Sequence, residues 1–99
     1  MTIGSTISGC TVLGAAPAGD GESYILLLKQ PGTRVQWVTG RVYVRQLPQP
    51  TEWWNGTYSD RLEDAVKHWV DRSCITNDDP TEAVKWLTRL IENTEKALA

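Results

Sequence analysis

The hydrophobic pattern of the chain changes its period at Asp60, and this change constrains the fold more than any other feature. Before Asp60, apolar and polar residues alternate over residues 35–46, as in a β-strand with two different sides. After Asp60, apolar residues recur at the spacing of an amphipathic helix, at Leu62, Ala65, Val66, Trp69 and Val70. The chain is therefore predicted to be an α+β protein with its strands first and its helices last.

Four segments before Asp60 have strand character, and turn signals rich in Gly and Pro separate them. We expect strands over residues 2–13, 23–30, 35–46 and 52–59, with a loop over residues 14–21 and a bulge at Gly56. The first strand is weak, and whether residues 2–13 join the sheet stays open. The segments predict an antiparallel sheet of three or four strands within residues 2–59, each strand pairing with the next.

Two helices are expected at the end of the chain, over residues 60–73 and 80–97. Asp60 is the expected N-cap of the first helix, and Asp79 followed by Pro80 marks the start of the second. The apolar side of the second helix is predicted to consist of Ala83, Val84, Leu87, Leu90, Ile91, Thr94 and Leu98. Without repeats or linkers, the 99 residues form a single predicted domain.

The strand over residues 35–46 has one aliphatic side and one side that is aromatic and basic. Val38, Val42 and Val44 form the aliphatic side, and we expect both helices to pack on this one face of the sheet. The other side then faces solvent or a partner, and it makes a candidate binding surface of Trp37, Thr39, Arg41, Tyr43 and Arg45. Such residue types are enriched at interaction hot spots.

The next strand contributes one more aromatic residue to this surface. Trp53 and Trp54 are neighbours, so their side chains lie on opposite faces of the strand. We include Trp53 in the predicted partner-binding set, while which of the two is exposed stays open.

Catalytic and metal chemistry have no signature in the sequence. The one histidine, His68, lies in the middle of the first helix without a partner residue for acid–base work. Cys10 and Cys74 are far apart, fit no metal-binding spacing and are expected to stay reduced and unbridged. We expect no enzymatic activity, no metal, no cofactor and no small-molecule substrate.

Charge and hydropathy limit the classes of partner. Residues 1–59 carry a net charge of +1 and residues 60–99 a net charge of −3, which gives −2 for the whole chain. An acidic chain does not favour nonspecific binding to nucleic acid, which depends on Lys and Arg. Neither a signal peptide nor an apolar run long enough to cross a bilayer is seen, so we expect a cytoplasmic protein without membrane contact.

The segment from Trp54 to Trp69 reads Trp-Asn-Gly-Thr-Tyr-Ser-Asp-Arg-Leu-Glu-Asp-Ala-Val-Lys-His-Trp. Its strand ends in Trp-x-Gly-x-Tyr, and Asp-x-Leu-Glu-x-Ala-Val then opens a helix. This step resembles small uncharacterised proteins of actinobacterial phages. At the level of the fold it is also similar to the DNA-binding domains of plant ethylene-response factors and to integrase arm-binding domains, whose sheet lies against DNA. The phage resemblance implies an accessory protein of unknown activity in the host cytoplasm, and it carries over no functional residues.

Three functional hypotheses follow. The leading one is a noncatalytic phage-type accessory protein that binds another protein through the aromatic and arginine face, or that associates with itself. The first alternative is a DNA-binding domain that uses the same face, although this face carries few arginines and the chain is acidic. The second alternative is an acidic regulator or nucleic-acid mimic that acts through its helical half.

Overall fold

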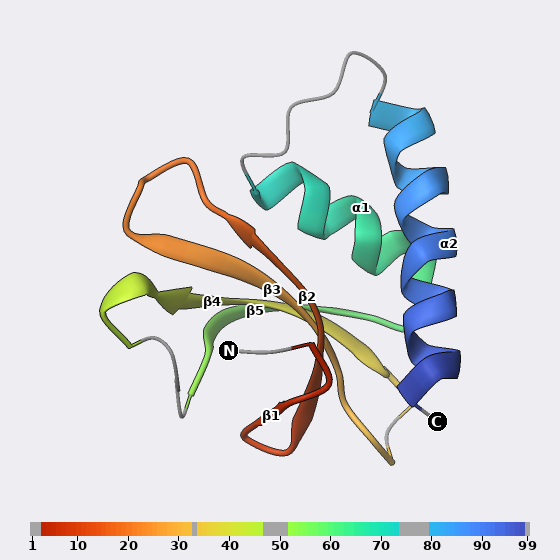
Figure 1. Cartoon of the computed structure of the whole chain (residues 1–99), viewed down its shortest axis with the longest axis horizontal. Coiled ribbons are helices and arrows are strands. Elements are labelled where there is room, and N and C mark those ends of the chain that lie inside the picture. The colour runs from red at the N-terminus through yellow and green to blue at the C-terminus, as the bar shows by residue number, and fades with distance from the viewer. Residues whose placement is uncertain (1–2, 33, 47–51, 74–79, 99) are drawn as a thin grey trace.

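The computed structural model describes residues 3–32, 34–46, 52–73 and 80–98, and it confirms the α+β class. The helices come last: α1 (Leu62–Arg72) and α2 (Pro80–Leu98). They follow five strands and a short 3-10 helix: β1 (Thr6–Ile7), β2 (Cys10–Pro17), β3 (Ser23–Lys29), β4 (Trp37–Tyr43), η1 (Val44–Gln46) and β5 (Trp54–Ser59). The strands form one antiparallel, curled sheet in chain order (Figure 1), as a meander does.

The prediction of three or four strands was wrong, because the first expected strand is a hairpin. Ser8 and Gly9 have φ angles of 49° and 80°, and these two left-handed residues form the turn between β1 and β2. β2 then continues to Pro17, through residues that were expected to be a loop. Its Gly14 does not mark a turn: a Cβ there would lie 2.9 Å from Cζ2 of Trp69 in α1. A close helix contact therefore explains this glycine.

The strand β3 is buried on both sides of the sheet. Four consecutive residues of β3, from Ile25 to Leu28, are 0% exposed. Alternate ones join the residues of both helices in one apolar cluster: Leu13, Ala16, Ala18, Ile25, Leu27, Leu62, Ala65, Val66, Trp69, Val70, Leu87 and Ile91. We call this the helix side of the sheet. The opposite side holds a second cluster, made of Ile7, Cys10, Val12, Leu26, Leu28, Val38 and Val42.

The predicted orientation of β4 was wrong. Val38 and Val42 belong to the cluster on the opposite side, in which no described helix residue takes part. Val44 lies beyond the end of β4, in η1, and is 44% exposed. Alternation separates the two sides of a strand but does not tell which side meets the helices. Because β3 is apolar on both sides, each side needed a cover, and the curled sheet itself provides the second one.

The helices agree with the sequence in most respects. α1 buries its whole predicted stripe, but its N-cap is Arg61 and makes no side-chain hydrogen bond, so the prediction of Asp60 as the cap was wrong. α2 begins at Pro80 as expected, and the predicted cap Asp79 lies outside the described residues. Leu90 was expected on the apolar side but is 47% exposed.

α1 packs on β3, β4 and β5, while α2 packs on α1 and β2. This arrangement brings the C-terminal ends of α1 and α2 close to the side chains of β4. In the described part of the chain, neither helix is long and apolar enough to cross a membrane.

Candidate interaction surface

Trp37 connects β4 to α2. Its indole N–H donates a hydrogen bond to Oε1 of Glu95 at 2.9 Å. Lys29 forms an ion pair with the same carboxylate at 3.3 Å, and its Nζ lies 5.7 Å from the centroid of the Trp37 ring. The sequence analysis included Trp37 in the candidate binding surface. In the structure this side chain is half-buried in contacts within the chain.

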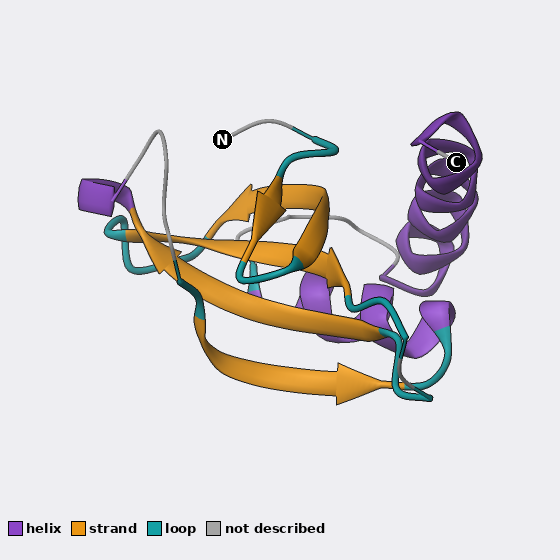
Figure 2. Cartoon of the chain, turned by 90° about the horizontal axis from the view of Figure 1, so that it is seen from below, coloured by secondary structure: helices purple, strands orange, loops and turns teal. Residues whose placement is uncertain are grey.

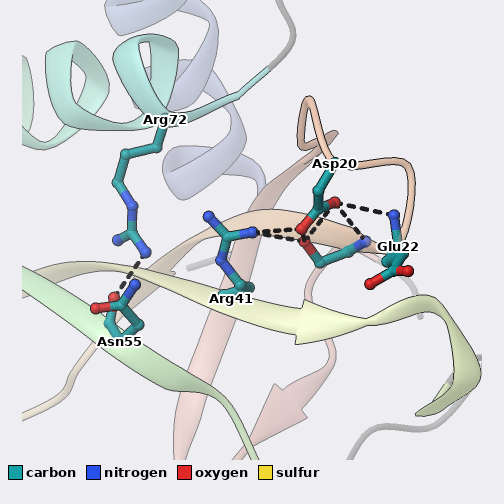
Figure 3. Close-up of polar contacts among 6 residues, drawn as sticks. Asp20, Glu22, Arg41, Asn55 and Arg72 are labelled. Carbon is teal, nitrogen blue, oxygen red and sulfur yellow. Dashed lines mark hydrogen bonds and ion pairs between the residues drawn. The ribbon is translucent and has the colours of Figure 1, made fainter.

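Arg72, in the last turn of α1, reaches across β4 and β5. Its Nη1 donates to the carbonyl oxygen of Thr39 at 2.8 Å and to Oγ1 of Thr39 at 3.0 Å. Its Nη2 donates to the carbonyl oxygen of Asn55 at 2.7 Å (Figure 3). Asn55 is left-handed, with a φ of 57°, and lies where the register of β5 shifts between Trp54 and Thr57. Arg72 therefore holds the bulge that the sequence predicted at Gly56.

The described carboxylates leave the charge of Arg72 without a close counter-ion. Burial lowers the pKa of Arg72, and the positive charge of Arg41 lowers this pKa further. Among the described residues, no carboxylate forms an ion pair with Arg72. Sequence reasoning missed this residue, because a basic residue near the end of a helix is common and does not indicate a contact with a distant strand.

Arg41 is held by the loop between β2 and β3. Its Nη1 donates to Oδ2 of Asp20 and to Oγ of Ser23, both at 2.8 Å (Figure 3). Asp20 Oδ1 also accepts the backbone N–H groups of Glu22 at 2.9 Å and Ser23 at 3.1 Å. The N–H of Glu22 and the hydroxyl of Ser23 lower the pKa of Asp20, and Arg41 adds to the effect. The charge of Arg41 is thus largely neutralised within the chain.

Four side chains of β4, η1 and β5 form a stack that we call the aromatic–arginine stack: Arg45, Tyr43, Trp54 and Arg41. The guanidinium of Arg45 lies 4.4 Å from the centroid of the Tyr43 ring. The Tyr43 and Trp54 rings are 5.3 Å apart and tilted by 30°. The guanidinium of Arg41 lies 5.7 Å from the centroid of the Trp54 ring. Although it is held in this way, the Trp54 side chain is 42% exposed.

Trp53 lies on the opposite side of the sheet and packs inside the fold. A Cβ at Gly40 would lie 2.8 Å from Cε3 of Trp53, and a Cβ at Gly56 would lie 2.6 Å from its Cζ3. The ring also meets Tyr58 edge-on at 6.0 Å. Of the two neighbouring tryptophans, Trp54 is therefore the more exposed one, and Trp54 replaces Trp53 in the candidate surface.

A shallow hollow adjoins the stack and is lined by Gly21, Glu22, Tyr43, Val44 and Arg45. Within the described residues, no group of three or more His, Cys, Asp or Glu side chains could hold a metal ion. Cys10 is a buried free thiol; burial raises its pKa, and the interaction with Trp53 offsets part of that rise. Cys74 lies outside the described residues.

No protein-family model, no curated protein and no solved structure matches this chain. The candidate surface is therefore interpreted from its geometry and chemistry alone. The resemblance to phage proteins stays a prediction.

Proposed function

We propose that this chain is a noncatalytic protein-binding domain whose aromatic–arginine stack docks an acidic, partly apolar segment of a partner. The observation that carries the proposal is the exposed Trp54 ring, which lies beside both the Tyr43 ring and the Arg41 guanidinium. A tryptophan that is already ordered loses little conformational entropy on binding. Tryptophan and arginine are also the residue types in which binding energy is most often concentrated.

The charges near the stack favour an acidic protein segment over a phosphate backbone. Arg41 forms an ion pair with Asp20, and Arg72 donates hydrogen bonds to backbone and hydroxyl oxygens. Of the two arginines in the stack, Arg45 is the one that is exposed to solvent. Binding to a nucleic acid needs several such cations. A cytoplasmic location, where a thiol such as Cys10 stays reduced, is part of the proposal.

A selection from a display library of random peptides tests this function, with the intact protein as bait. We expect enriched peptides to be acidic with apolar residues, and to lose binding to the Trp54→Ala and Arg45→Ala proteins. Trp86→Ala is the matched control, because Trp86 is 65% exposed on α2, which packs on α1 and β2.

Two outcomes would contradict the proposal. If the enriched peptides bound the Trp54→Ala protein as well as the unchanged one, the stack would not be the docking site. If the Arg45→Ala protein instead lost a DNA complex that weakens steeply with salt, with a log–log slope of about −2 to −3, the DNA-binding alternative would replace the proposal. Dimers seen by analytical ultracentrifugation and lost in the Trp54→Ala protein would indicate self-association.

A further inference from the structure

The outer edge of β5 is not paired with any other described strand. β5 is the last strand of the sheet, and none of the other described elements lies beyond it (Figure 2). The N–H of Gln30 donates to the carbonyl oxygen of Gln36 at 2.7 Å, and that of Val44 to the carbonyl oxygen of Glu22 at 2.8 Å. Gln36 and Val44 flank β4, and both are even-numbered. The even-numbered residues of β4 therefore direct their backbone groups toward β3, and the odd-numbered ones direct them toward β5.

This alternation fixes which groups of β5 point outward. Trp37 and Thr39 of β4 are the partners of Ser59 and Thr57, so the backbone groups of these two β5 residues point toward β4. The backbone N–H and C=O groups of Tyr58, and the C=O group of Gly56, consequently point away from β4. They present the spacing that an added strand needs.

Natural proteins usually protect such an edge, and β5 is protected only in its first half. Edge strands are commonly blunted by charged residues, prolines, bulges or short length. At the other edge of the sheet, β1 has only two residues. β5 has six residues, with the sequence Trp-Asn-Gly-Thr-Tyr-Ser, and none of them is charged or a proline. Its bulge at Asn55 leaves the part from Gly56 onward open to pairing.

Two exposed aromatic side chains flank this edge, one on each side of the sheet. Trp54 is paired with Arg41 in the register and belongs to the stack, and it is 42% exposed. Tyr58 is paired with Val38, so its ring lies on the opposite side, where it is 52% exposed. The side chains of an added strand alternate in the same way, so they would meet Trp54 and Tyr58 in turn.

The charged and apolar residues near β5 indicate which sequence an added strand would need. On the helix side, the guanidinium of Arg72 lies on β5 at Asn55 and Thr57, without an ion-pair partner among the described residues. On the opposite side the neighbours of Tyr58 are apolar, namely Trp53 and Val38. A strand with acidic residues toward Arg72 and apolar residues toward Tyr58 would complement both.

We infer that the partner segment is an extended peptide of alternating acidic and apolar residues, which binds by adding a strand to the edge of β5. This inference rests on the proposed function and specifies how the docked segment lies. Backbone hydrogen bonds to Gly56 and Tyr58 would provide affinity, and the alternation would provide specificity.

The test uses a short synthetic peptide of alternating Glu and Val, and its dissociation constant is measured for the intact protein. Two control peptides replace Glu by Lys or place the same residues in two blocks. We expect only the alternating Glu peptide to bind well, and methylation of its backbone nitrogens at one set of alternate positions to abolish binding. Hydrogen exchange of the Tyr58 amide should slow when the peptide is added.

Two variants at Tyr58 separate the contribution of the backbone N–H at the strand edge from the contribution of the side chain. Tyr58→Ala removes the ring and keeps the outward N–H, whereas Tyr58→Pro removes both. We expect the Pro variant to bind about tenfold more weakly than the Ala variant, as expected for one lost hydrogen bond. The N–H is not part of the β4 ladder, so proline is tolerated at this edge.

The two proposals fail in different ways. If the peptide binds, if Trp54→Ala abolishes binding, and if neither Tyr58→Pro nor amide exchange responds, strand addition is wrong and the stack still docks the partner. If Tyr58→Pro weakens binding and Trp54→Ala does not, the peptide binds at the edge of β5 and not at the stack. Should Tyr58→Pro unfold the protein, amide exchange and the methylated peptides decide the question, and equal affinity for both sets of methylated peptides would overturn strand addition.

Discussion

A tryptophan packs against glycine on each side of the sheet, but only one of the two makes a hydrogen bond through its indole N–H. On the helix side, Trp69 covers Gly14 and donates its N–H to the carbonyl oxygen of Ile25 at 2.9 Å. On the opposite side, Trp53 covers Gly40, and its buried indole N–H has no hydrogen-bond partner among the described residues. A hydrogen bond therefore orients the Trp69 ring, whereas close packing orients the Trp53 ring.

The same difference extends to the neighbouring residues. Arg72 on the helix side bonds a carbonyl and a hydroxyl of buried Thr39, and Trp37 bonds Glu95. The cluster on the opposite side is aliphatic apart from Cys10, whose thiol lies near Trp53. We infer that polar contacts orient the helices on the sheet, whereas close packing alone determines the opposite side.

The largest expected effect is on the helix side, at Val66 of α1. This residue is 0% exposed, so Val66→Asp would place an unpaired charge in the apolar cluster. We expect the free energy of unfolding to fall by about 3–5 kcal/mol, measured by chemical denaturation. Lys67→Asp is the matched control on the exposed side of the same helix and should cost less than about 1 kcal/mol. Similar losses for both variants would show that the side of α1 that meets the sheet is assigned wrongly.

The burial of α1 was predictable because its period of apolar residues is local to one helix. The number of strands was not, since the turn at Ser8 and Gly9 needs two left-handed residues that the sequence alone does not reveal. The sequence also could not predict which side of β4 meets the helices. That choice depends on α1 docking over β3, a strand that is apolar on both sides.

The candidate surface was predicted in part. Tyr43, Arg41 and Arg45 form the stack, and their role in binding stays a prediction. The exchange of Trp53 for Trp54 follows from the bulge in β5. Without the bulge, Trp54 would lie on the same side as Tyr58, because residues four apart in a regular strand share a side. The register shift moves Trp54 to the side of Arg41 instead, and a shift of this kind depends on its partner strand.

A smaller effect is expected on the opposite side, at Gly40 of β4. A Cβ at this position would lie 2.8 Å from Cε3 and 3.2 Å from Cβ of Trp53. Gly40→Ala should therefore lower the free energy of unfolding by about 1–3 kcal/mol, as overpacking does. Gly19→Ala is the control, because a Cβ there would meet nothing within 4 Å.

The combination with Trp53→Leu checks the mechanism of this loss. A smaller side chain removes the ring atoms nearest to the new Cβ, so Gly40→Ala should cost less in the Trp53→Leu protein than in the unchanged one. Equal costs in the two backgrounds would mean that the close packing of Trp53 on Gly40 does not hold this side together.

The smallest effect is a pH dependence confined to the polar rim of the helix side, at Asp20. The hydrogen bonds from Glu22 and Ser23 and the charge of Arg41 lower the pKa of this carboxyl in the folded chain. A carboxyl with a lowered pKa contributes stability above its unfolded pKa, and loses the contribution as the pH falls through the folded value. The loss should therefore appear only below about pH 4. We expect the difference in denaturation midpoint between the unchanged and the Asp20→Asn proteins to be constant near neutral pH and to shrink in acid. In the same titration, the amide NMR signals of Glu22 and Ser23 should shift, while that of Val38 on the opposite side should not. A midpoint difference that stays constant down to acid pH would show that Asp20 does not hold Arg41 in this way.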